Sequence, residues 1–321
     1  MQLIRGLINL NHQADACVAT IGNFDGVHIG HRAIIKRVIE QAKQSKLESC
    51  VILFEPHPKE VFLKDKCPAR LTRFSEKYAQ FKALGIDKLL VLKFNQNLRE
   101  MPATRFIDKI LIEQLRIKHL VVGDDFQFGY KRQGNYQLLR SQGEGHYTVE
   151  PTPSIVVEHL GEKHRVSSSL VREALVKNDL AFVEKLLERR YSMRGKVGYG
   201  QQLGSKIGFP TANVVLSRRK LALSGVYLVK AYWTSNYLDP QSWGVANCGS
   251  RPTVDGKDYR LEVHLLGVSP SLYGIELKVD FYTFIRAEKK FANVEILTEQ
   301  IKLDIKQAAK LAKELALKID N

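Results

Sequence analysis

The fold of this chain is decided by Gly22-Asn23-Phe24-Asp25-Gly26-Val27-His28-Ile29-Gly30-His31. An apolar run at residues 17–21 precedes this stretch, and a helical pattern of apolar residues begins at Ala33. His28 and His31 therefore lie where a strand passes into a helix, among glycines that let a ligand approach the backbone. α/β proteins hold polyphosphates at such a junction, because the first N–H groups of the helix point at the ligand. The stretch thus predicts an α/β fold and an anionic ligand.

The composition places the chain among ordinary globular proteins. Its 321 residues favour two domains, and 44% of them are hydrophobic and 26% charged. The formal net charge of +15 attracts anions such as nucleotides, flavin phosphates or nucleic acid, without choosing among them. We find no charged leader, and no apolar run reaches the roughly 18 residues of a spanning helix. The four cysteines form no Cys-x-x-Cys pair: Cys17, Cys50, Cys67 and Cys248. We expect a soluble cytoplasmic protein with reduced thiols.

The first half of the chain alternates strand-like and helix-like segments. Apolar runs typical of strands occur at Cys17–Ile21, Cys50–Phe54, Lys88–Leu92 and His119–Gly123. Helical patterns occur at Arg32–Lys43, Ser75–Leu84 and Thr104–Leu115. This alternation predicts a parallel, Rossmann-like sheet covered by helices.

The pattern changes near residue 187. Two short helices are expected just before it, at Ser168–Lys177 and Leu180–Glu188. Extended segments with glycines between them follow at Arg194–Tyr199, Gly225–Tyr232, Trp243–Asn247, Tyr259–Leu266 and Glu276–Tyr282. We therefore predict a small antiparallel β-barrel and two domains, residues 1–187 and 188–321.

A long amphipathic helix is expected at the C-terminus. Its apolar positions recur at three- and four-residue steps: Leu297, Ile301, Ile305, Ala308, Ala312, Leu315 and Ile319. Lysines occupy the opposite side, at residues 302, 306, 310 and 313. We expect the helix to pack on the barrel, and a membrane or RNA role for the lysine face is the alternative.

His28 and His31 suit the binding of phosphates. They are three residues apart at an expected helix start, where the helix end contributes about half a positive charge. Imidazoles with an ordinary pKa of about 6.5 can add charge or donate hydrogen bonds to phosphate oxygens. A capped turn with one packed histidine is the structural alternative. A metal pair completed by His57 is another, although no fourth His or Cys falls at a zinc-like spacing.

Four motifs in the first half resemble those of one family. Residues 22–31 are similar to the HxGH-type motif of nucleotidylyltransferases. With Phe54-Glu-Pro-His-Pro58 they resemble the adenylyltransferase half of the bacterial bifunctional riboflavin kinase/FMN adenylyltransferases, or FAD synthetases. Gly123-Asp-Asp-Phe-Gln-Phe-Gly129 resembles the Gly-x-Asp-Phe-x-Phe-Gly segment of that family. Arg165-Val-Ser-Ser-Ser-Leu-Val-Arg172 resembles its Ile-Ser-Ser-Thr-x-x-Arg motif, with Val166 and Ser169 as mild departures.

The resemblance implies a nucleotidylyltransferase-type domain in which the phosphate of FMN attacks the α-phosphorus of ATP. A phosphate monoester has a second pKa of about 6, so this nucleophile is already ionised and needs no base. His28 and His31 are the predicted catalytic residues, as stabilisers of the leaving pyrophosphate. The predicted ATP ligands are Gly22, Phe24, Asp25, His28, His31, Asp125, Ser167, Ser168, Ser169 and Arg172. The predicted flavin contacts of this half are His57, Phe126 and Phe128.

The second half carries a glycine-rich, basic segment at residues 195–213 that contains neither a P-loop nor a Gly-x-Gly-x-x-Gly motif. Its end, Gly208-Phe-Pro-Thr-Ala-Asn213, resembles the flavokinase hexapeptide, which implies a riboflavin kinase-like barrel. Thr211 and Asn213 offer hard oxygen ligands for Mg²⁺ on one side of an extended segment. A Pro-Thr turn closed by the asparagine is the alternative. The predicted ATP-binding residues here are Gly200, Gly204, Lys206, Gly208, Thr211 and Asn213, of which Thr211 and Asn213 are the metal ligands.

Phosphorylation of an alcohol benefits from a base that accepts its proton. The run Leu261-Glu262-Val263-His264-Leu265 alternates, so Glu262 and His264 share one face of a strand. By resemblance to the Glu-x-His-Leu strand of the family, Glu262 is the predicted catalytic base, and a solvated glutamate on a barrel strand is the alternative. The segment Phe284–Phe291 also resembles the family, which implies that Arg286 contacts the flavin, with the nucleotide as the alternative.

The motifs together predict a Mg²⁺-dependent bifunctional enzyme. It phosphorylates riboflavin with ATP to give FMN, and then transfers AMP from a second ATP to FMN to give FAD. An adenylyltransferase for another phosphate acceptor would leave the barrel unexplained. A basic RNA-binding or regulatory protein would need aromatic residues interleaved with Lys and Arg, whereas the charge here is scattered. The expected partners are riboflavin, FMN and ATP, with no nucleic acid or membrane; a homo-oligomer remains open.

Overall fold

A computed structural model describes residues 1–10, 16–200, 204, 207–233, 240–253 and 256–319 of the chain. The polypeptide divides into two units, each with its own internal contacts. The first unit comprises Met1–Pro68 and Thr72–Ser168, and the second comprises Ala69–Leu71 and Ser169–Asn321. The short segment at residues 69–71 thus belongs to the second unit, although both of its neighbours in the chain belong to the first.

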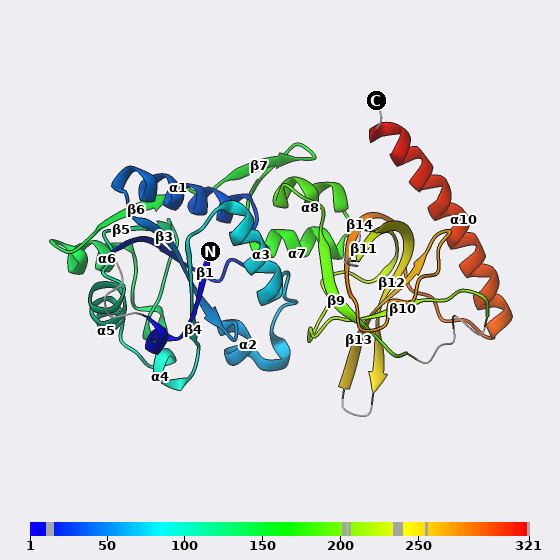
Figure 1. Cartoon of the computed structure of the whole chain (residues 1–321), viewed down its shortest axis with the longest axis horizontal. Helices are drawn as coiled ribbons and strands as arrows, with labels where there is room; N and C mark the ends of the chain where they lie inside the picture. The colour runs from blue at the N-terminus through cyan, green and yellow to red at the C-terminus, as the bar shows by residue number, and fades with distance from the viewer. Residues whose placement is uncertain (11–15, 201–203, 205–206, 234–239, 254–255, 320–321) are drawn as a thin grey trace. The chain divides into compact units, whose positions relative to one another are not determined.

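Six parallel strands in the order β1-β4-β3-β2-β5-β6 form the sheet of the first unit (Figure 1). They are β1 (Gln2–Arg5), β2 (Cys17–Ile21), β3 (Glu48–Glu55), β4 (Lys88–Lys93), β5 (His119–Gly123) and β6 (Thr148–Thr152). Every residue of β2 is buried, which is typical of a parallel strand covered on both faces. The four strands predicted from the sequence are present. The unpredicted β1 and β6 are the edge strands, where a four-residue length and Pro151 are tolerated.

The strand order reverses between β2 and β5. From β2 the chain adds β3 and β4 on one side, whereas β5 and β6 extend the sheet on the other. Thr20 of β2 pairs in register with Val121 of β5, so the loops that follow these strands leave the sheet at the same edge. Open α/β sheets bind ligands at the carboxyl ends of strands at such a reversal. The loops in question are residues 22–28 and 124–129.

Helices cover both faces of this sheet. They are α1 (Ile29–Ser45), α2 (Pro58–Leu63), α3 (Phe74–Leu84), α4 (Gln96–Arg99), α5 (Ala103–Phe106), which continues as a π-helical segment at Ile107–Gln114, and α6 (Tyr136–Gly143). Single 3₁₀ turns occur at Leu7–Asn9, Lys64–Lys66 and Tyr130–Arg132, and β7 (Val156–His159) and β8 (Glu162–Arg165) form a hairpin. Ile35 of α1 and Phe81 of α3 are fully buried in the core on one face. Ile107 and Ile110 are fully buried in the core on the other.

The second unit contains a closed antiparallel barrel in the order β10-β13-β12-β11-β14-β9. Its strands are β9 (Ser192–Gly198), β10 (Ala212–Val215), β11 (Gly225–Trp233), β12 (Gln241–Thr253), β13 (Gly256–Leu265) and β14 (Glu276–Arg286). Alternate residues of β13, Leu261 and Val263, are buried at 0% and 1% exposure and point away from the face that carries Glu262. The sequence predicted five of these strands. It did not reveal β10, a four-residue strand directly after a Pro-Thr pair.

Three helices accompany the barrel: α7 (Ser168–Val176), α8 (Leu180–Leu187) and α10 (Val294–Ile319). Ala308 and Ala312 of α10 are buried against Leu228 of β11, with Trp243 and Leu315 packed around them. The predicted packing of the C-terminal helix on the barrel is therefore present (Figure 1, α10 in red).

The division between the two units falls at residues 168 and 169, so nearly all of α7, and all of α8, are counted with the barrel. The boundary near residue 187 that the sequence predicts separates the motifs of the two expected activities, and it stays a prediction. Among the helices of the described residues, none combines the length and the apolar character that crossing a membrane would require.

Candidate active sites

The loop between β2 and α1 brings the two predicted histidines together. His28 is the N-cap of α1, and its Nδ1 accepts a hydrogen bond from the backbone N–H of His31 at 3.4 Å. The two rings stack with centroids 3.6 Å apart and planes 19° apart. Because Nδ1 of His28 accepts, the proton of its neutral ring lies on Nε2, which is then a donor. Phe24, only 3% exposed, supports His31 edge-on at 5.2 Å between ring centroids.

This loop has an unusual backbone. Phe24, Gly26 and Val27 all have positive φ values, of 48°, 88° and 43°. A left-handed conformation is costly for a β-branched residue such as Val27, and it persists only where surrounding contacts impose it. The loop therefore needs anchors outside itself.

Three side chains from distant parts of the first unit supply these anchors. Thr72 Oγ1 accepts from the N–H of Gly26 at 2.9 Å and donates to Asp25 Oδ1 at 3.1 Å, while the Thr72 N–H donates to the same oxygen at 3.0 Å. Lys77 of α3 is fully buried; its Nζ donates to the carbonyl of Asn23 at 3.2 Å and lies 3.4 Å from Glu55 Oε1. Ser168 Oγ donates to the carbonyl of Asp25 at 2.8 Å.

These contacts define roles that the sequence did not reveal. Asp25, a predicted ATP ligand, is 3% exposed and holds the loop through Thr72. Ser168, another predicted ligand, uses its hydroxyl proton on the loop itself. Thr72 and Lys77 were not predicted, because each lies 46 or more residues from the loop in sequence and outside every motif.

Asp125 lies beside a cation that it shares with Asp124. Its Oδ2 is 2.8 Å from Nη2 of Arg165 in β8, and the same nitrogen is 3.1 Å from Oδ1 of Asp124. The hydroxyl of Ser154 donates to Asp124 and lowers the pKa of that carboxyl. A carboxylate next to a phosphate would repel it, and Arg165 offsets one of the two negative charges of Asp124 and Asp125. The position of Arg165, two residues before the serine run, is the signal that could have identified it.

Aromatic side chains gather at this edge of the sheet. Phe126 and Phe128 stack with centroids 5.5 Å apart and planes 12° apart. Phe128 is 7% exposed and packs in the core against Phe106, whereas Phe126 is partly exposed. The array continues through further rings, with centroids 5.7–6.4 Å apart, from Phe106 to Phe54, Phe94 and Phe62. Phe126 thus offers a supported aromatic surface to a planar ring.

The other residues predicted for the first site are placed as follows. His57 is the N-cap of α2, where its Nδ1 accepts from the N–H of Lys59 at 3.1 Å. Ser167 is partly buried in the first unit. Ser169 and Arg172 are counted with the second unit, where Arg172 Nε donates to the carbonyl of Ala69 at 2.6 Å, and their role toward ATP stays a prediction. In the part of the chain that the structure describes, no three His, Cys, Asp or Glu side chains gather as a metal ion would require.

The barrel places two of the predicted kinase residues in one row. Asn213 of β10 lies directly opposite Glu262 of β13, and Glu262 lies directly opposite Asn247 of β12. Residues paired in this way point to the same face of the sheet, so three polar side chains stand side by side across three strands. The sequence predicted Asn213 and Glu262 separately, and the strand pairing joins them. Asn247 was missed, although it stands in the predicted strand at residues 243–247.

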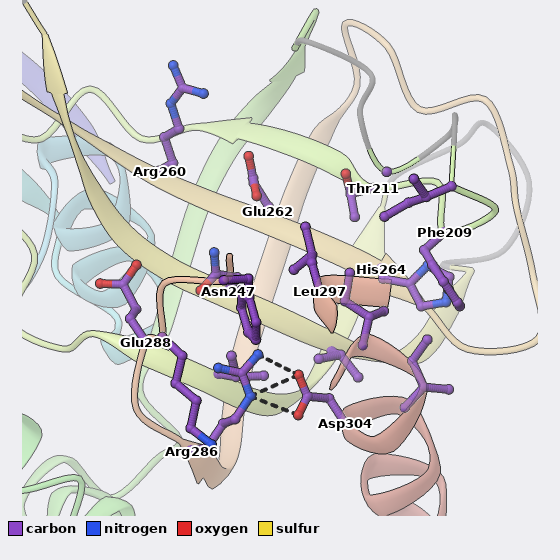
Figure 2. Close-up of a pocket in the computed structure, with 18 of the residues that line it drawn as sticks. Phe209, Thr211, Asn247, Arg260, Glu262, His264, Arg286, Glu288, Leu297 and Asp304 are labelled. Carbon is purple, nitrogen blue, oxygen red and sulfur yellow. Dashed lines mark hydrogen bonds and ion pairs between the residues drawn. The ribbon is translucent and has the colours of Figure 1, made fainter. Parts of the chain in front are cut away.

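This row opens into a cavity of about 340 Å³ (Figure 2). Thr211 and His264 line it together with Glu262, while Arg286 and Asp304 line the opposite side. Apolar side chains cover the region next to α10: Val226, Val245, Phe291, Leu297, Ile301 and Ile305. The cavity therefore has a polar end on β10 and β13 and a largely apolar end beneath α10.

His264 has a structural task in this cavity. Its Nδ1 lies 2.9 Å from the carbonyl oxygen of Pro210, and because a carbonyl only accepts, Nδ1 carries the proton. Its ring also meets Phe209 edge-on at 5.9 Å. His264 thus holds the segment before Thr211, and Glu262 is the carboxylate on the same face of β13.

Two glycines lie close to the predicted metal ligands and their support. A Cβ at Gly200 would overlap the amide of Asn213, and a Cβ at Gly204 would overlap the carbonyl oxygen of Phe209. Neither position can carry a larger residue without displacing a predicted ligand or its support. Gly208 lies in the turn before β10. Lys206 lies outside the described residues.

A second hollow, of about 260 Å³, adjoins the first and shares Thr211 with it. Its walls are Val197, Pro210, Ala212, Val263, Leu265 and residues 268–273. Within the last segment, Tyr273 stacks on Tyr199 with centroids 4.6 Å apart and planes 16° apart. Thr211 therefore stands at the boundary between the two cavities.

Both halves of the chain are similar to known proteins. The family model described as FAD synthetase matches residues 10–170, and the model described as riboflavin kinase matches residues 187–312. The bifunctional riboflavin kinase/FMN adenylyltransferase of Pseudomonas fluorescens is 46% identical over 316 residues, which cover 97% of this chain and 98% of that protein. Its counterparts are 42% identical over 306 residues in Escherichia coli K12 (95% of this chain, 96% of that protein), and 40% identical over 309 residues in Haemophilus influenzae (96% and 98%).

A solved structure shares the overall fold. A crystal structure from Streptococcus pneumoniae, described as a macrolide-efflux protein, matches with a TM-score of 0.79 and 25% identity, over 96% of this chain and 98% of that one. The parallel sheet, the closed barrel and the C-terminal helix therefore recur together in a solved structure. From its sequence matches over nearly the whole length, the chain belongs to the family of bifunctional riboflavin kinase/FMN adenylyltransferases.

Proposed function

We propose that this chain makes FAD from riboflavin in two ATP-dependent steps, at two separate sites. The barrel transfers the γ-phosphoryl group of ATP to the 5′-hydroxyl of riboflavin. The α/β site then transfers AMP from a second ATP to the FMN phosphate and releases pyrophosphate. The row of Asn213, Glu262 and Asn247, which opens into the cavity beside Thr211, is the observation that carries the proposal.

The first step needs a base, because an alcohol must lose its proton as the new P–O bond forms. Glu262 accepts that proton, and the bond between the γ-phosphorus and its bridging oxygen breaks to leave ADP. The hydroxyl of Thr211 and the amide oxygen of Asn213, next to the Glu262 carboxylate, form the hard oxygen set that Mg²⁺ prefers. When bound, Mg²⁺ would neutralise charge on the phosphate oxygens of ATP.

The two ends of the cavity suit the two ends of riboflavin. The apolar end beneath α10 fits the flavin ring, and the ribityl chain then extends toward Glu262. The adjoining hollow, lined by Pro210, Leu265 and Leu272, is where we place the adenine of ATP, since Thr211 lines both cavities and marks the position of the phosphates.

The second step needs no base, since the FMN phosphate is already ionised. An oxygen of this phosphate attacks the α-phosphorus, and the bond to the bridging oxygen of the pyrophosphate breaks. Nε2 of His28 and the ring of His31 stabilise the charge that develops on the leaving pyrophosphate. Arg165, paired with Asp124 and Asp125, offsets part of the negative charge at the edge of this site. Phe126 supports the flavin ring of FMN.

The location and partners follow from the same chemistry. Riboflavin, FMN and ATP are the partners that the two sites require, and Mg²⁺ is the proposed metal. The free, buried cysteines at positions 17, 50, 67 and 248 are consistent with the reducing cytoplasm. We assign residues 1–187 to adenylyl transfer and residues 188–321 to the kinase, following the motifs.

Product analysis tests the proposal directly. The purified chain is incubated with riboflavin, ATP and Mg²⁺, and flavins are separated by chromatography over time. FMN should appear first and FAD later, and FMN supplied with ATP should give FAD without a lag. A chain that adenylylates another phosphate acceptor but leaves riboflavin unchanged would refute the kinase assignment. Retention of RNA without flavin turnover would refute both.

A further inference from the structure

Arg286 and Asp304 form an ion pair in the wall of the kinase cavity (Figure 2). Nε of Arg286 donates to the two carboxylate oxygens at 2.9 and 3.0 Å, and Nη2 donates to Oδ2 at 2.7 Å. The side chains of Arg286 and Asp304 are only 15% and 5% exposed. The pair joins the end of β14 to α10, and removal of one partner from so buried a pair leaves the other uncompensated.

Further contacts set the orientation of this pair. Gln300, one helical turn before Asp304, donates from Nε2 to Asp304 Oδ1 at 2.9 Å. Nη1 of Arg286 donates to the carbonyl of Ala287 at 2.9 Å, and the guanidinium carbon lies 5.7 Å from the ring centroid of Phe291. The guanidinium plane is therefore held from two sides, by Asp304 and by the backbone of residue 287.

The donors of Arg286 can be counted. A guanidinium has five N–H groups, and these contacts use Nε, one N–H of Nη2 and one of Nη1. Two N–H groups, one on each Nη, make no hydrogen bond to any residue that the structure describes. Because Asp304 balances the charge, the pair suits an uncharged planar ligand with carbonyl acceptors better than a phosphate.

We propose that Asp304 is a positioning residue for riboflavin: it holds Arg286 so that the two remaining N–H groups meet the carbonyl oxygens of the flavin ring at the α10 end of the cavity. This inference rests on the proposed kinase function. It makes α10 a part of the substrate site, in addition to a cover of the barrel.

Asp304→Asn tests this role, because the amide keeps the shape of the carboxylate but removes its charge and places a donor against a donor. The KM for riboflavin should rise by about tenfold to hundredfold, while kcat and the KM for ATP change by less than about threefold. Formation of FAD from supplied FMN should stay at the wild-type rate. Glu299→Gln is the matched control, since Glu299 is exposed on the same helix and pairs with Lys302 there; its kinetics should equal the wild type.

A double-mutant cycle distinguishes positioning from a general effect on folding. If Asp304 acts through Arg286, the variant carrying both Arg286→Met and Asp304→Asn should have the riboflavin KM of Arg286→Met alone. Additive effects would overturn the proposal, as would an Asp304→Asn variant with the wild-type KM for riboflavin. Gln300→Ala provides a milder variant for the case in which Asp304→Asn does not fold. Its KM for riboflavin should rise about two- to fivefold, again with little change in kcat or in the KM for ATP. An unchanged KM for riboflavin in this variant would also count against the proposal.

The two proposals fail in different ways. Wild-type protein that forms no FMN would refute the kinase assignment itself. Wild-type protein that forms FMN, with Asp304 variants indistinguishable from it in riboflavin KM, would refute the positioning role and leave the kinase assignment intact.

Discussion

His28 caps a helix and is also the residue that we propose to stabilise the leaving pyrophosphate. Its Nδ1 caps α1 by accepting from the N–H of His31, and this contact leaves Nε2 as the proton carrier. His28 is 5% exposed and stacks on His31, so neither ring can rotate independently. The cap therefore determines which nitrogen of His28, Nε2, would donate to the leaving pyrophosphate.

At the residue scale, Thr72→Val tests the anchoring of the loop at residues 22–28. Valine has the size of threonine but cannot accept from Gly26 or donate to Asp25, so the left-handed loop loses an anchor. We expect FAD formation from FMN to fall by about tenfold to hundredfold, with riboflavin phosphorylation unchanged. Both rates are measured by chromatography of the flavins. Thr104→Val, at an exposed position of α5, is the control; equal effects of the two variants would contradict the anchoring role.

Glu262→Gln tests the base of the kinase step. The amide keeps the place of the carboxylate in the row but cannot take the proton of the alcohol. The kcat for FMN formation should fall by about 10²- to 10⁴-fold, with little change in the KM for ATP. Steady-state assays with riboflavin check this. A variant that retains the wild-type kcat would remove Glu262 as the base and return it to an ordinary barrel position.

At the scale of elements, charged side chains join helix α1 to the edge strand β6. Arg37 of α1 donates from Nε and Nη2 to the two carboxylate oxygens of Glu150 at 2.6 and 3.0 Å, and Glu150 lies in the edge strand β6. His119 of β5 also lies 3.1 Å from Glu150 Oε2. These contacts hold β6 to α1 and β5. The residues of β6 are half-buried or exposed, so this strand has little apolar surface to bury.

The pH dependence of Glu150→Gln tests this connection. The hydrogen bond from Arg37, aided by His119, lowers the pKa of Glu150 below its ordinary value of 4.5. A lowered folded-state pKa stabilises the fold above pH 4.5, and this contribution is lost as the pH falls through the folded pKa. At pH 7 the variant should lose roughly 0.5–1 kcal/mol in its free energy of unfolding, since the pair is partly exposed.

Urea unfolding at a series of pH values measures this difference. The gap between wild type and Glu150→Gln should narrow steadily below pH 4.5. A gap that stays constant from pH 7 to strongly acidic solution would show that the ion pair is not its cause.

At the scale of the whole molecule, the two proposed reactions use different sets of residues. The sheet of the first unit presents its ligands at the strand-order reversal, whereas the barrel of the second presents a row across β10, β13 and β12. Damage to one site should therefore leave the other reaction intact.

Complementation between two variants tests this independence. Asn213→Ala should lose FMN formation by more than about 100-fold and still convert FMN to FAD, while His31→Ala should do the reverse. A mixture of the two proteins should make FAD from riboflavin, because FMN released by one variant can reach the other. Chromatography of the mixture and of each variant alone is the measurement. Loss of both activities in either single variant would contradict the two-site arrangement.

Much of the fold could be predicted from the sequence because its signals are local. The buried run of β2 and the alternation of Leu261-Glu262-Val263 each identify an element without reference to the rest of the chain. Short elements such as β1 and β10 were missed, since four residues hold too little pattern. The prediction of the family is confirmed by the comparisons.

The sequence by itself thus determined the two fold types, their order, and the residues that stand inside motifs, such as His28 and Asn213. Only the tertiary structure decided which residues meet. Thr72 and Lys77 reach the first loop across 46 or more residues of chain, and Asn247 and Asp304 join the second site through strand register and helix packing. The physical reason is that a motif records local chain geometry. Contacts between distant segments depend on how sheets and helices pack, which no short stretch of sequence specifies.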